Sequence, residues 1–419
     1  MKRALVGSSV LGAALVLALL LAPRAGAAEK GPIRIGLLTS KTGVLAIHGA
    51  HQMAATEAFK DKYGTTVAGR KVEFYAEDDQ SKVPLGVTKV RKLITSDKVH
   101  IVMGGLFAST GYAIAPLGDE YQTPIFVWSC PDDLSQRKRF KFVVKYFSCS
   151  QPQHAMAHWL RTNKPNVKKV IIFGPDYAFG YESSGGFQKV FEDMGGQVVQ
   201  KIYAPINTVD YGPYIGQFRK DADGMFVTLA GPQALRFPKQ YQQAGLRDKY
   251  VLVGNGTNTD EFALAAQGED VLGWITAHIY GGAADPSKDN QEFVKLFKKH
   301  LDNKDPGYYA EGYYGALVLI YKAIEAIKGD VENKAKFMEA LGRTKVTEGM
   351  PAGPKVSDGY GNLNTNVYIR DVRQDASGKK YHHVLHVYEN VSQFWTYKPE
   401  EFLKQPVYDK DFPPCKFCQ

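Results

Sequence analysis

The stretch IRIGLLTSKTGVLAIHGAHQMAATEAFKDKY, residues 33–63, joins a short apolar run to a longer amphipathic segment. The aliphatic run at 33–38 predicts a buried strand, and residues 49–63 predict a helix. A strand followed by a helix begins a β-α-β unit, whose two strands lie parallel in one sheet. We therefore expect an α/β fold in which helices cover a parallel sheet.

The same alternation continues as far as residue 128. We expect further strands at 72–76, 99–103 and 124–128, and a helix at 112–120. Another helix is indicated by four apolar residues whose spacing of four, three and four places them on one face: Val83, Val87, Val90 and Ile94.

A second unit of the same kind restarts at Lys168. Its expected strands lie at 170–173, 197–203, 225–229 and 250–253, with helices between them. Two helices follow at 308–327 and 332–341, and then a β-rich tail that contains 366–372 and 383–389. The chain is therefore predicted to return to the first unit and afterwards to the second.

Length and charge narrow the class of protein. The chain has 419 residues. A single hydrophobic core rarely extends over so long a chain, so two lobes are expected. The formal net charge is +9, and the basic residues are spread among acidic ones. Because no basic block with interleaved aromatic residues occurs, we do not expect a nucleic-acid partner.

Residues 1–28 have the features of a secretory signal peptide. Lys2 and Arg3 precede an apolar run at 10–22, and small residues follow at 25–28. The run is shorter than a bilayer-spanning helix usually needs, and no cysteine stands at the cleavage site to carry a lipid. We expect a cleaved leader and a soluble periplasmic protein; an uncleaved anchor is the alternative.

The four cysteines fall into two pairs, which are candidates for disulfides in an oxidising compartment. These are Cys130 with Cys149 and Cys415 with Cys418. The spacing of the second pair also occurs in redox and zinc sites, but this pair follows two prolines at the C-terminal end and no second CxxC is present. A small local disulfide or free thiols are expected there.

Two loops after predicted strands hold residues suited to binding. In open parallel sheets, ligands bind at the carboxyl ends of the strands, where helix N-termini converge. The first loop is TSKTG at 39–43 with His48 beyond it, and the second is GGLFASTG at 104–111. Glycine permits close approach of the backbone, and Ser109 and Thr110 can offer hydroxyl and amide hydrogens to a carboxylate. The alternative is that they only cap the next helix.

At these residues the chain resembles the family of periplasmic leucine/isoleucine/valine-binding proteins, the type I receptors of ABC importers, which also include amide, urea and aromatic-acid binders. The likeness covers nearly all of the chain after the leader. Five segments carry it: IGLLTSKTGVLAIHG at 35–49, GGLFASTGYAIAP at 104–116, PIFVWS at 124–129, FGPDYAFG at 173–180, and GYGN at 359–362 after Asp358.

The resemblance implies two doubly wound parallel-sheet lobes joined by three crossings, near Ser150, Tyr280 and Pro351. The N-terminal lobe would comprise 29–150 with 281–350, and the C-terminal lobe 151–280 with 351–419. Such lobes close over a solute by hinge motion and exclude water from the cleft. The resemblance further implies a monomer that delivers a small solute to ABC transporter permease subunits and that needs no cofactor.

Position by position, the resemblance places Ser109 and Thr110 at the carboxylate of the ligand, with Trp128 and Ser129 completing that wall. Capping and core filling are the alternative roles for these four residues. Tyr177 matches the aromatic residue that the second lobe lays over the ligand, although a surface tyrosine is the alternative. The remaining expected ligand-binding residues are His48, Phe107, Gly231, Gln233, Gly256, Thr257 and Tyr280.

Two departures from the family pattern leave the ligand open. His48 stands where the family has a pocket tryptophan, and Gly256 where amino-acid binders carry a glutamate for the α-ammonium group. A buried ammonium group needs a carboxylate partner, for which Asp260 and Asp176 are the candidates. Both an amino acid and a carboxylate without an amine, with an aromatic or aliphatic body, therefore remain as predicted solutes.

We expect no catalytic site and no metal site. The chain has no G-x-S-x-G elbow, no Walker-type phosphate loop and no G-x-G-x-x-G after a strand. Asp78–Asp79 and Asp132–Asp133 are interpreted as caps or solvated charges. Two histidine pairs lack a third nearby ligand, which disfavours zinc: His154 with His158, and His382 with His386. A sensory receptor subunit and, less favoured, a hydrolytic enzyme are the alternative functions.

Overall fold

The computed structural model describes residues 1 and 30–418. Met1–Pro32 form one unit and Ile33–Gln419 form another. Apart from Met1, the predicted signal peptide at 1–28 lies outside the described residues. Within the described part of the chain, none of the helices combines the length and the apolar character needed to cross a membrane.

The first sheet consists of the N-terminal strands in the order β2-β3-β1-β4-β5-β6. All neighbouring pairs are parallel except β2 with β3, so the carboxyl ends of β1, β3, β4, β5 and β6 meet at one edge. The strands are β1 (Ile33–Thr39), β2 (Thr66–Val67), β3 (Arg70–Asp78), β4 (Ile101–Gly104), β5 (Ile125–Val127) and β6 (Val143–Lys145).

Three helices connect these strands: α2 (Ala46–Tyr63), α3 (Val83–Thr95) and α4 (Ala108–Glu120). α3 and α4 pack together in one apolar cluster, in which Val90 and Leu93 of α3 meet Ile114 and Leu117 of α4. α4 begins at Ala108, four residues before the predicted start at 112. The reason is that the backbone is already helical from the residue after Phe107, which is itself extended.

The second sheet has the order β12-β13-β14-β11-β10-β9-β7-β8, and β15 pairs with β14. Its parallel part is β7 (Lys169–Pro175), β8 (Gln197–Ala204), β9 (Gly224–Val227), β10 (Val251–Asn255) and β11 (Ile275–His278). Its antiparallel part is β12 (Lys345–Val346), β13 (Lys355–Ser357), β14 (Leu363–Gln374) and β15 (Lys380–Val391). The sheet is therefore mixed, because the short turn between β14 and β15 can only join antiparallel strands.

The helices of this part include α5 (Gln151–Asn163), which precedes β7 and packs against α6 (Ala178–Asp193), the helix after β7. Their apolar faces share one core with β7 and β9, around Phe187 and Phe226. The remaining helical elements of this part are α7 (Gly212–Ile215), α8 (Gln233–Gln243) and α9 (Glu261–Leu264), with short 3-10 turns at Gly256–Thr259 and Glu269–Val271. A further 3-10 turn, at Asp132–Ser135, lies between β5 and β6 of the first sheet.

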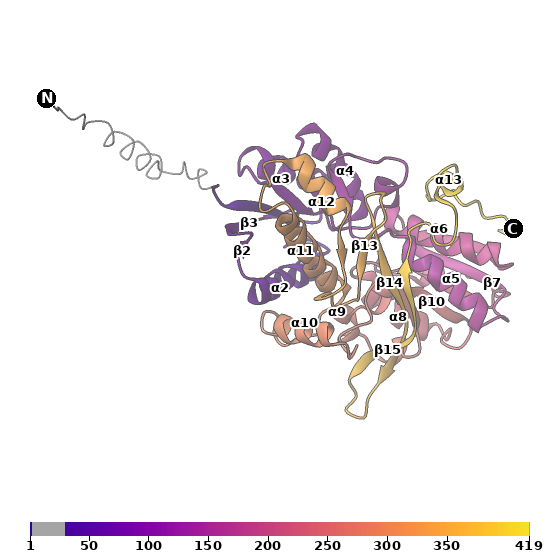
Figure 1. Ribbon diagram of the computed structural model, residues 1–419. Helices are drawn as coiled ribbons and strands as arrows, with labels where there is room; N and C mark the ends of the chain where they lie inside the picture. Colours follow the sequence, from indigo (N-terminus) through magenta and orange to yellow (C-terminus); the bar gives the residue numbers. More distant parts are fainter. Residues whose placement is uncertain (2–29, 419) are drawn as a thin grey trace. The chain divides into compact units, whose positions relative to one another are not determined.

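The chain then returns to the first sheet. Helices α10 (Lys288–Lys298), α11 (Tyr308–Ala326) and α12 (Lys334–Gly342) follow β11, and α10 and α11 pack on α2 (Figure 1). β12 rejoins the second sheet at Lys345, ahead of the boundary expected at 351. We call the first sheet with α2–α4 and α10–α12 the first lobe, and the second sheet with α5–α9 the second lobe. The expected two-lobed α/β fold class is confirmed.

A C-terminal tail at 392–418 follows β15 and contains α13 (Pro399–Phe402). The guanidinium group of Arg137 donates to three tail carbonyl oxygens, at 2.8 Å to Gln405, 3.1 Å to Pro406 and 3.3 Å to Phe402. The side-chain amide of Gln188 on α6 donates to the carbonyl oxygen of Pro414. The tail is therefore bonded both to the segment after β5 and to α6, beside which it lies in Figure 1.

Candidate functional site

A small cavity lies between the lobes at the carboxyl ends of their parallel strands. Its volume is about 30 Å³, against the roughly 300–1,000 Å³ of a typical ligand pocket. The two walls are therefore nearly in contact. The cavity is lined by Leu45, Leu106, Ala108, Trp128, Ser129, Cys130, Phe147, Tyr177, Phe179, Ala230, Tyr308 and Tyr309.

Two glycines at the end of β4 shape the first-lobe wall. Gly104 has a φ of 144° and Gly105 a φ of 85°, conformations that favour glycine. A Cβ atom on Gly104 would lie 2.1 Å from the carbonyl oxygen of Leu38. The chain can therefore turn closely past β1 before it enters α4, and this turn brings Leu106 and Ala108 to the cavity.

The N-terminus of α4 opens beside this cavity. Phe107 is the N-cap residue, and its side chain accepts no hydrogen bond from the first turn. Uncapped N–H groups at a helix start, together with the helix dipole, favour an anion such as a carboxylate. The carbonyl oxygen of Phe107 accepts the hydroxyl of Ser129 at 3.1 Å, which ties β5 to this turn.

The structure separates the two residues that the sequence predicts for carboxylate binding. Ser109 is half-buried in the first turn of α4. Thr110 is fully buried, and its methyl group faces α3, since a Cβ atom on Gly86 would lie 2.9 Å from it. Its hydroxyl has no hydrogen-bond partner among the described residues. Thr110 can therefore offer its N–H group at the helix start, while its side chain belongs to the α3–α4 contact.

Trp128 and two tyrosines form the floor of the cavity. Tyr308 and Tyr309, at the start of α11, stack on the Trp128 ring with centroids 5.9 Å and 5.4 Å away. Sequence reasoning missed both tyrosines, although it predicted a helix from 308. The available signal was a glycine and two aromatic residues at a helix start that follows a predicted crossing between lobes.

Tyr177 forms the opposite wall. It is the N-cap residue of α6, at the carboxyl end of β7 in the second lobe, and it is half-buried. Its ring packs edge to face on the Phe107 ring beside the cavity, with centroids 5.6 Å apart. The structure thus brings the predicted residues Phe107, Trp128, Ser129 and Tyr177 to one place.

Gly231 and Gln233 lie behind this wall. A Cβ atom on Gly231 would be 3.2 Å from the Leu45 side chain of the first lobe, so the two lobes touch there. The Gln233 side chain accepts the N–H of Ala230 and donates to the carbonyl oxygens of Ala204 and Pro205. Because its amide group is occupied in holding these loops, Gln233 does not line the cavity.

Gly256, Thr257 and Tyr280 are likewise placed in the framework of the second lobe. The hydroxyl of Thr257 donates to the carbonyl oxygen of Leu229 at 2.6 Å, and that of Tyr280 donates to Asn290 at 2.8 Å. The carbonyl oxygen of Gly256 accepts a guanidinium N–H of Arg370 at 3.3 Å. None of the three predicted residues lines the cavity.

His48 separates the cavity from a second space. Its ring lies 4.1 Å from the Tyr309 ring, which lines the cavity, and 4.3 Å from the Phe262 ring, which lines a groove of about 820 Å³ between the lobes. Burial lowers the pKa of His48 to about 3, and His51 adds to the shift, so the imidazole is neutral near pH 7. Both ring nitrogens lack a hydrogen-bond partner in the described chain.

Neither acid considered for an ammonium group is free to receive one. Asp260 is fully buried, and its carboxyl group accepts the N–H of Tyr308 at 2.9 Å. Asp176 accepts the hydroxyl of Tyr181 and the ammonium group of Lys410 away from the cavity. The cavity wall itself carries no carboxylate among the described residues.

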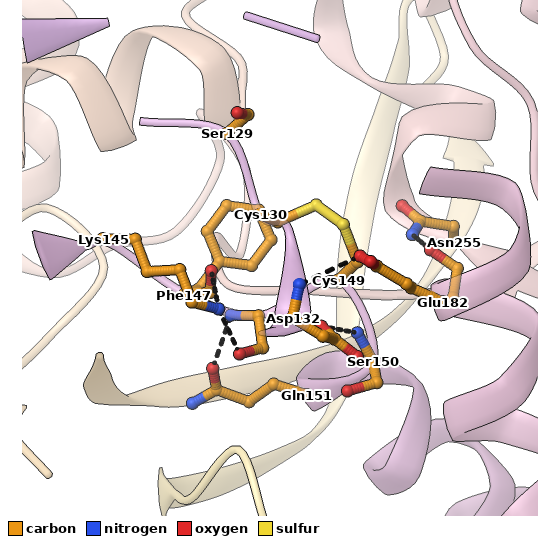
Figure 2. Close-up of a disulfide and its surroundings, with 12 residues drawn as sticks. Ser129, Cys130, Asp132, Lys145, Phe147, Cys149, Ser150, Gln151, Glu182 and Asn255 are labelled. Atoms are coloured by element: carbon orange, nitrogen blue, oxygen red, sulfur yellow. Dashed lines mark hydrogen bonds between the residues drawn. A yellow bond between two sulfur atoms is a disulfide. The ribbon is translucent and has the colours of Figure 1, made fainter. Parts of the chain in front are cut away.

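A buried charged cluster lies on the hinge side of the lobes, shown in Figure 2. The Cys130–Cys149 disulfide joins the end of β5 to the first crossing. Glu182 of α6 accepts the N–H of Asp132 at 3.0 Å and the hydroxyl of Tyr112 on α4. Asp132 accepts the N–H of Ser150 at 3.2 Å (Figure 2). The second lobe is therefore bonded to the first by a buried carboxylate.

Burial shifts the pKa of each ionisable group in this cluster toward its neutral form. It raises the pKa of Asp132 and of Glu182, and it lowers the pKa of Lys145 to about 8. Lys145 is fully buried and donates to the carbonyl oxygen of Phe147 and the hydroxyl of Ser148. Its positive charge offsets the neighbouring carboxylates.

The described residues do not favour a metal centre. The grouping with metal-ligand proximity is Asp132, Cys149 and Glu182, but the Cys149 sulfur is in the disulfide, which removes the thiolate that a metal needs. Cys415 is likewise joined to Cys418. The predicted histidine pairs bond elsewhere: His154 and His158 approach tyrosine hydroxyls, and His382 bonds Glu261.

Comparisons with known proteins agree with this architecture. Residues 32–379 match the family described as periplasmic binding protein. A relative from Brucella melitensis biotype 1, the Leu/Ile/Val-binding protein homolog 6, is 28% identical over 371 residues, which is 87% of this chain and 94% of the relative.

Two solved structures from Rhodopseudomonas palustris are similar over most of their length. One is a solute binding protein of an ABC transporter from strain BisB5 in complex with 3,4-dihydroxybenzoic acid, with a TM-score of 0.81 and 29% identity over 87% of this chain and 99% of that one. The other, from strain HaA2 with p-hydroxybenzoic acid, has a TM-score of 0.80 and 28% identity over 87% and 98% of the two chains.

Proposed function

Because the chain belongs to the periplasmic binding protein family, we propose that it is the solute-binding component of an ABC importer and that its solute is a small carboxylate. The family resemblance, the type I two-lobed fold and the prediction of a binding protein rather than an enzyme are confirmed by the similar proteins. The identity of the solute, the residues that bind it, the hinge, and the export and delivery described below are proposals.

One observation carries the carboxylate: the uncapped start of α4 opens beside a cavity walled by aromatic rings. The helix start offers N–H groups to a negative charge, and Ser109 adds a hydroxyl group. The rings of Trp128, Tyr177, Tyr308 and Tyr309 offer flat faces to an apolar body. An aromatic carboxylate satisfies both halves of this site.

The cavity favours a solute without an ammonium group. Asp260 and Asp176 are engaged by other partners, and an unpaired ammonium group is costly to bury. The two Rhodopseudomonas palustris structures hold hydroxybenzoic acids, which carry a carboxylate and no amine. A branched-chain amino acid is the second candidate, since the Brucella relative bears the name of a Leu/Ile/Val-binding protein homolog.

Binding requires the lobes to separate and close again. A cavity of about 30 Å³ cannot admit a benzoate ring without moving its walls. The chain passes between the lobes three times, and we place the hinge at these crossings, with 29–150 and 281–344 moving against 151–280 and 345–419, since β12 already belongs to the second sheet. Closure would remove water from the solute and bring Tyr177 onto it.

Export and delivery complete the proposal. Residues 1–28 act as a cleaved signal peptide, so that the mature protein works as a monomer in the periplasm and presents its solute to permease subunits. A sensory receptor subunit would use the same cleft, and the two roles are separated by asking whether deletion of the gene abolishes uptake of the solute.

A binding screen tests the solute class. We expect benzoate, 4-hydroxybenzoate or 3,4-dihydroxybenzoate to raise the melting temperature of the purified protein, since a ligand at a hundred times its Kd adds about 2.7 kcal/mol of stability. Methyl 4-hydroxybenzoate is the control, because it keeps the ring and loses the negative charge. Calorimetric titration then gives the affinity.

Stabilisation by leucine, isoleucine or valine alone would replace the aromatic carboxylate by an amino acid. If the methyl ester stabilises the protein as strongly as the acid does, the start of α4 does not bind the carboxylate of the solute. Conversion of the solute at catalytic amounts of protein would contradict pure binding.

A further inference from the structure

The carboxyl group of Asp260 touches helix starts in both lobes. Its Oδ1 atom lies 3.4 Å from the backbone nitrogen of Phe262 in α9 of the second lobe. Its Oδ2 atom accepts the N–H of Tyr308, the first residue of α11 in the first lobe, at 2.9 Å. One buried side chain therefore completes the hydrogen bonding of two helix N-termini on either side of the cleft.

The residue before Tyr308 leaves room for this contact. A Cβ atom on Gly307 would lie 2.0 Å from Oδ1 of Asp260 and 2.5 Å from its Cγ, so no larger residue fits without moving the lobes apart. Gly307 is the N-cap residue of α11 and has no side chain to offer. Asp260 thus supplies, from the second lobe, the cap that α11 lacks in its own lobe.

The capped turn carries the rings of the cavity floor. Tyr308 and Tyr309 have centroids 4.0 Å apart, and the Tyr308 ring also lies 3.7 Å from the ring of His278 in the second lobe. Both tyrosines line the cavity. Where these rings stand therefore depends on the first turn of α11.

We propose that Asp260 is a positioning residue that latches the closed form: it holds the second lobe to the start of α11 and so places Tyr308 and Tyr309 against the solute. The proposal rests on the proposed function for one of its readouts, the affinity for a solute. When the lobes separate, the Tyr308 N–H loses this acceptor. A bond made only in the closed form shifts the equilibrium toward closure by its own free energy.

The charged and titratable groups that act on this carboxyl group are Glu261 of α9, Arg370 of β14, and Tyr308 and Tyr309 of α11. His278 of β11 and His382 of β15 interact with Arg370 in turn. Burial raises the pKa of Asp260 to about 7, the negative charge of Glu261 adds to the shift, and Arg370 opposes it. Burial lowers the pKa of both histidines, so they are neutral around pH 7.

The raised pKa gives closure a pH dependence. In the open form water reaches Asp260, and its pKa returns toward the ordinary value of 3.8. Closure then takes up a proton between pH 3.8 and about 7, so affinity falls as the pH rises through this window and levels off above it.

Two substitutions separate the latch from a merely structural role. Asp260→Ala removes the acceptor, whereas Asp260→Asn keeps an oxygen at the same place and cannot ionise. Asp176→Asn is the matched control, because Asp176 lies in the same lobe and bonds Tyr181 and Lys410 instead of α11. Calorimetry with 4-hydroxybenzoate from pH 5.5 to 8 gives the affinity, and small-angle X-ray scattering without solute gives the radius of gyration.

We expect Asp260→Ala to weaken binding of 4-hydroxybenzoate by roughly 10- to 100-fold and to enlarge the solute-free radius of gyration. Asp260→Asn should bind within about threefold of the native protein at pH 5.5 and should lose a large part of the native pH dependence. Asp176→Asn should match the native protein in every measurement.

Native affinity together with native scattering for Asp260→Ala would overturn the latch. If that variant does not fold, Asp260→Asn decides the question, and an unchanged pH profile would overturn it. If the native protein binds no 4-hydroxybenzoate, the proposed solute is wrong, while the scattering of the two Asp260 variants still supports or refutes the latch.

Discussion

The lobes meet in two places, and the two places differ in the kind of contact that joins them. On the cleft side the contacts are mainly between rings: Tyr177 faces Phe107 and Tyr308 lies against His278, with the Asp260 carboxyl group crossing beside them. On the hinge side, Glu182 crosses between the lobes among buried charges, beside a disulfide. Ring contacts are weak individually and need no fixed partner, whereas a buried charge that loses its partner is expensive.

The difference in contacts indicates which side of the lobe interface can open. Separating the rings exposes apolar surface that a solute can cover again, so the cleft side can exchange one set of contacts for another. Separating Glu182 from Tyr112 and from the Asp132 N–H would strand a carboxyl group in the protein interior. We therefore expect the hinge side to stay together while the cleft side moves.

The largest effect is expected from removing Lys145, the cation of the buried charged cluster on the hinge side. Lys145→Met should cost about 3–5 kcal/mol of the free energy of unfolding, because Asp132, Glu182 and Asp358 then lose the buried cation that they share. Urea denaturation followed by circular dichroism measures this loss.

The loss should be larger at pH 8 than at pH 6. The pKa of these carboxyl groups is raised by burial in the folded protein, so the stability that depends on their neutral form disappears as the pH rises. Lys164→Met, at an exposed position after α5, is the control and should be neutral. An equal, small effect of both substitutions would show that the cluster is not a structural centre.

A change on the cleft side should act on affinity instead of stability. Tyr177→Ala should weaken binding of the best carboxylate by roughly 10- to 100-fold, since the second lobe loses the ring it lays over the solute. Calorimetry measures the affinity and thermal unfolding without solute measures the stability, which should change little. Tyr181→Ala, one turn along α6 and bonded to Asp176, provides the comparison; a similar loss there would place the effect outside the cavity.

The smallest effects are expected for substitutions at the start of α4, which separate the role of Ser109 from that of Thr110. Ser109→Ala should weaken binding about 2- to 10-fold, the value of one hydrogen bond. Thr110→Val should leave the affinity unchanged and slightly raise the melting temperature, because it replaces a buried, unpartnered hydroxyl by a methyl group. If Thr110→Val weakens binding more than Ser109→Ala does, the side chain of Thr110 contacts the solute after all.

The fold could be predicted because its signals are local. Apolar runs of strand length alternate with amphipathic helices throughout 33–255, and each run buries its own face in a sheet. The antiparallel additions could not be predicted as such. β14 and β15 have the same alternating character as the other strands, and their direction follows from a turn at 375–379 whose geometry the pattern does not specify.

The candidate site could be predicted only in part, since Trp128 and Ser129 of the first lobe and Tyr177 of the second line the cavity. The first-lobe residues lie on the loop after β4 and at the end of β5, where chain order alone brings strand ends together. Gln233 and Thr257 have the right chemistry at the right strand ends, but they satisfy backbone groups of their own loops. Tyr308 and Tyr309 reach the cavity because the chain crosses back between the lobes. The glycine and the two aromatic residues at this helix start do not by themselves specify where that crossing places the rings.

The C-terminal tail has a practical consequence for anyone who shortens this protein. The family match ends at residue 379, so trimming to that boundary looks safe, yet it would delete β15 and every carbonyl oxygen that Arg137 and Gln188 bond beyond it. Tyr408, which packs against Gly185 of α6, would leave with them. A protein truncated at residue 379 would leave the edge of β14 unpaired and an apolar face of α6 uncovered. We expect it to aggregate.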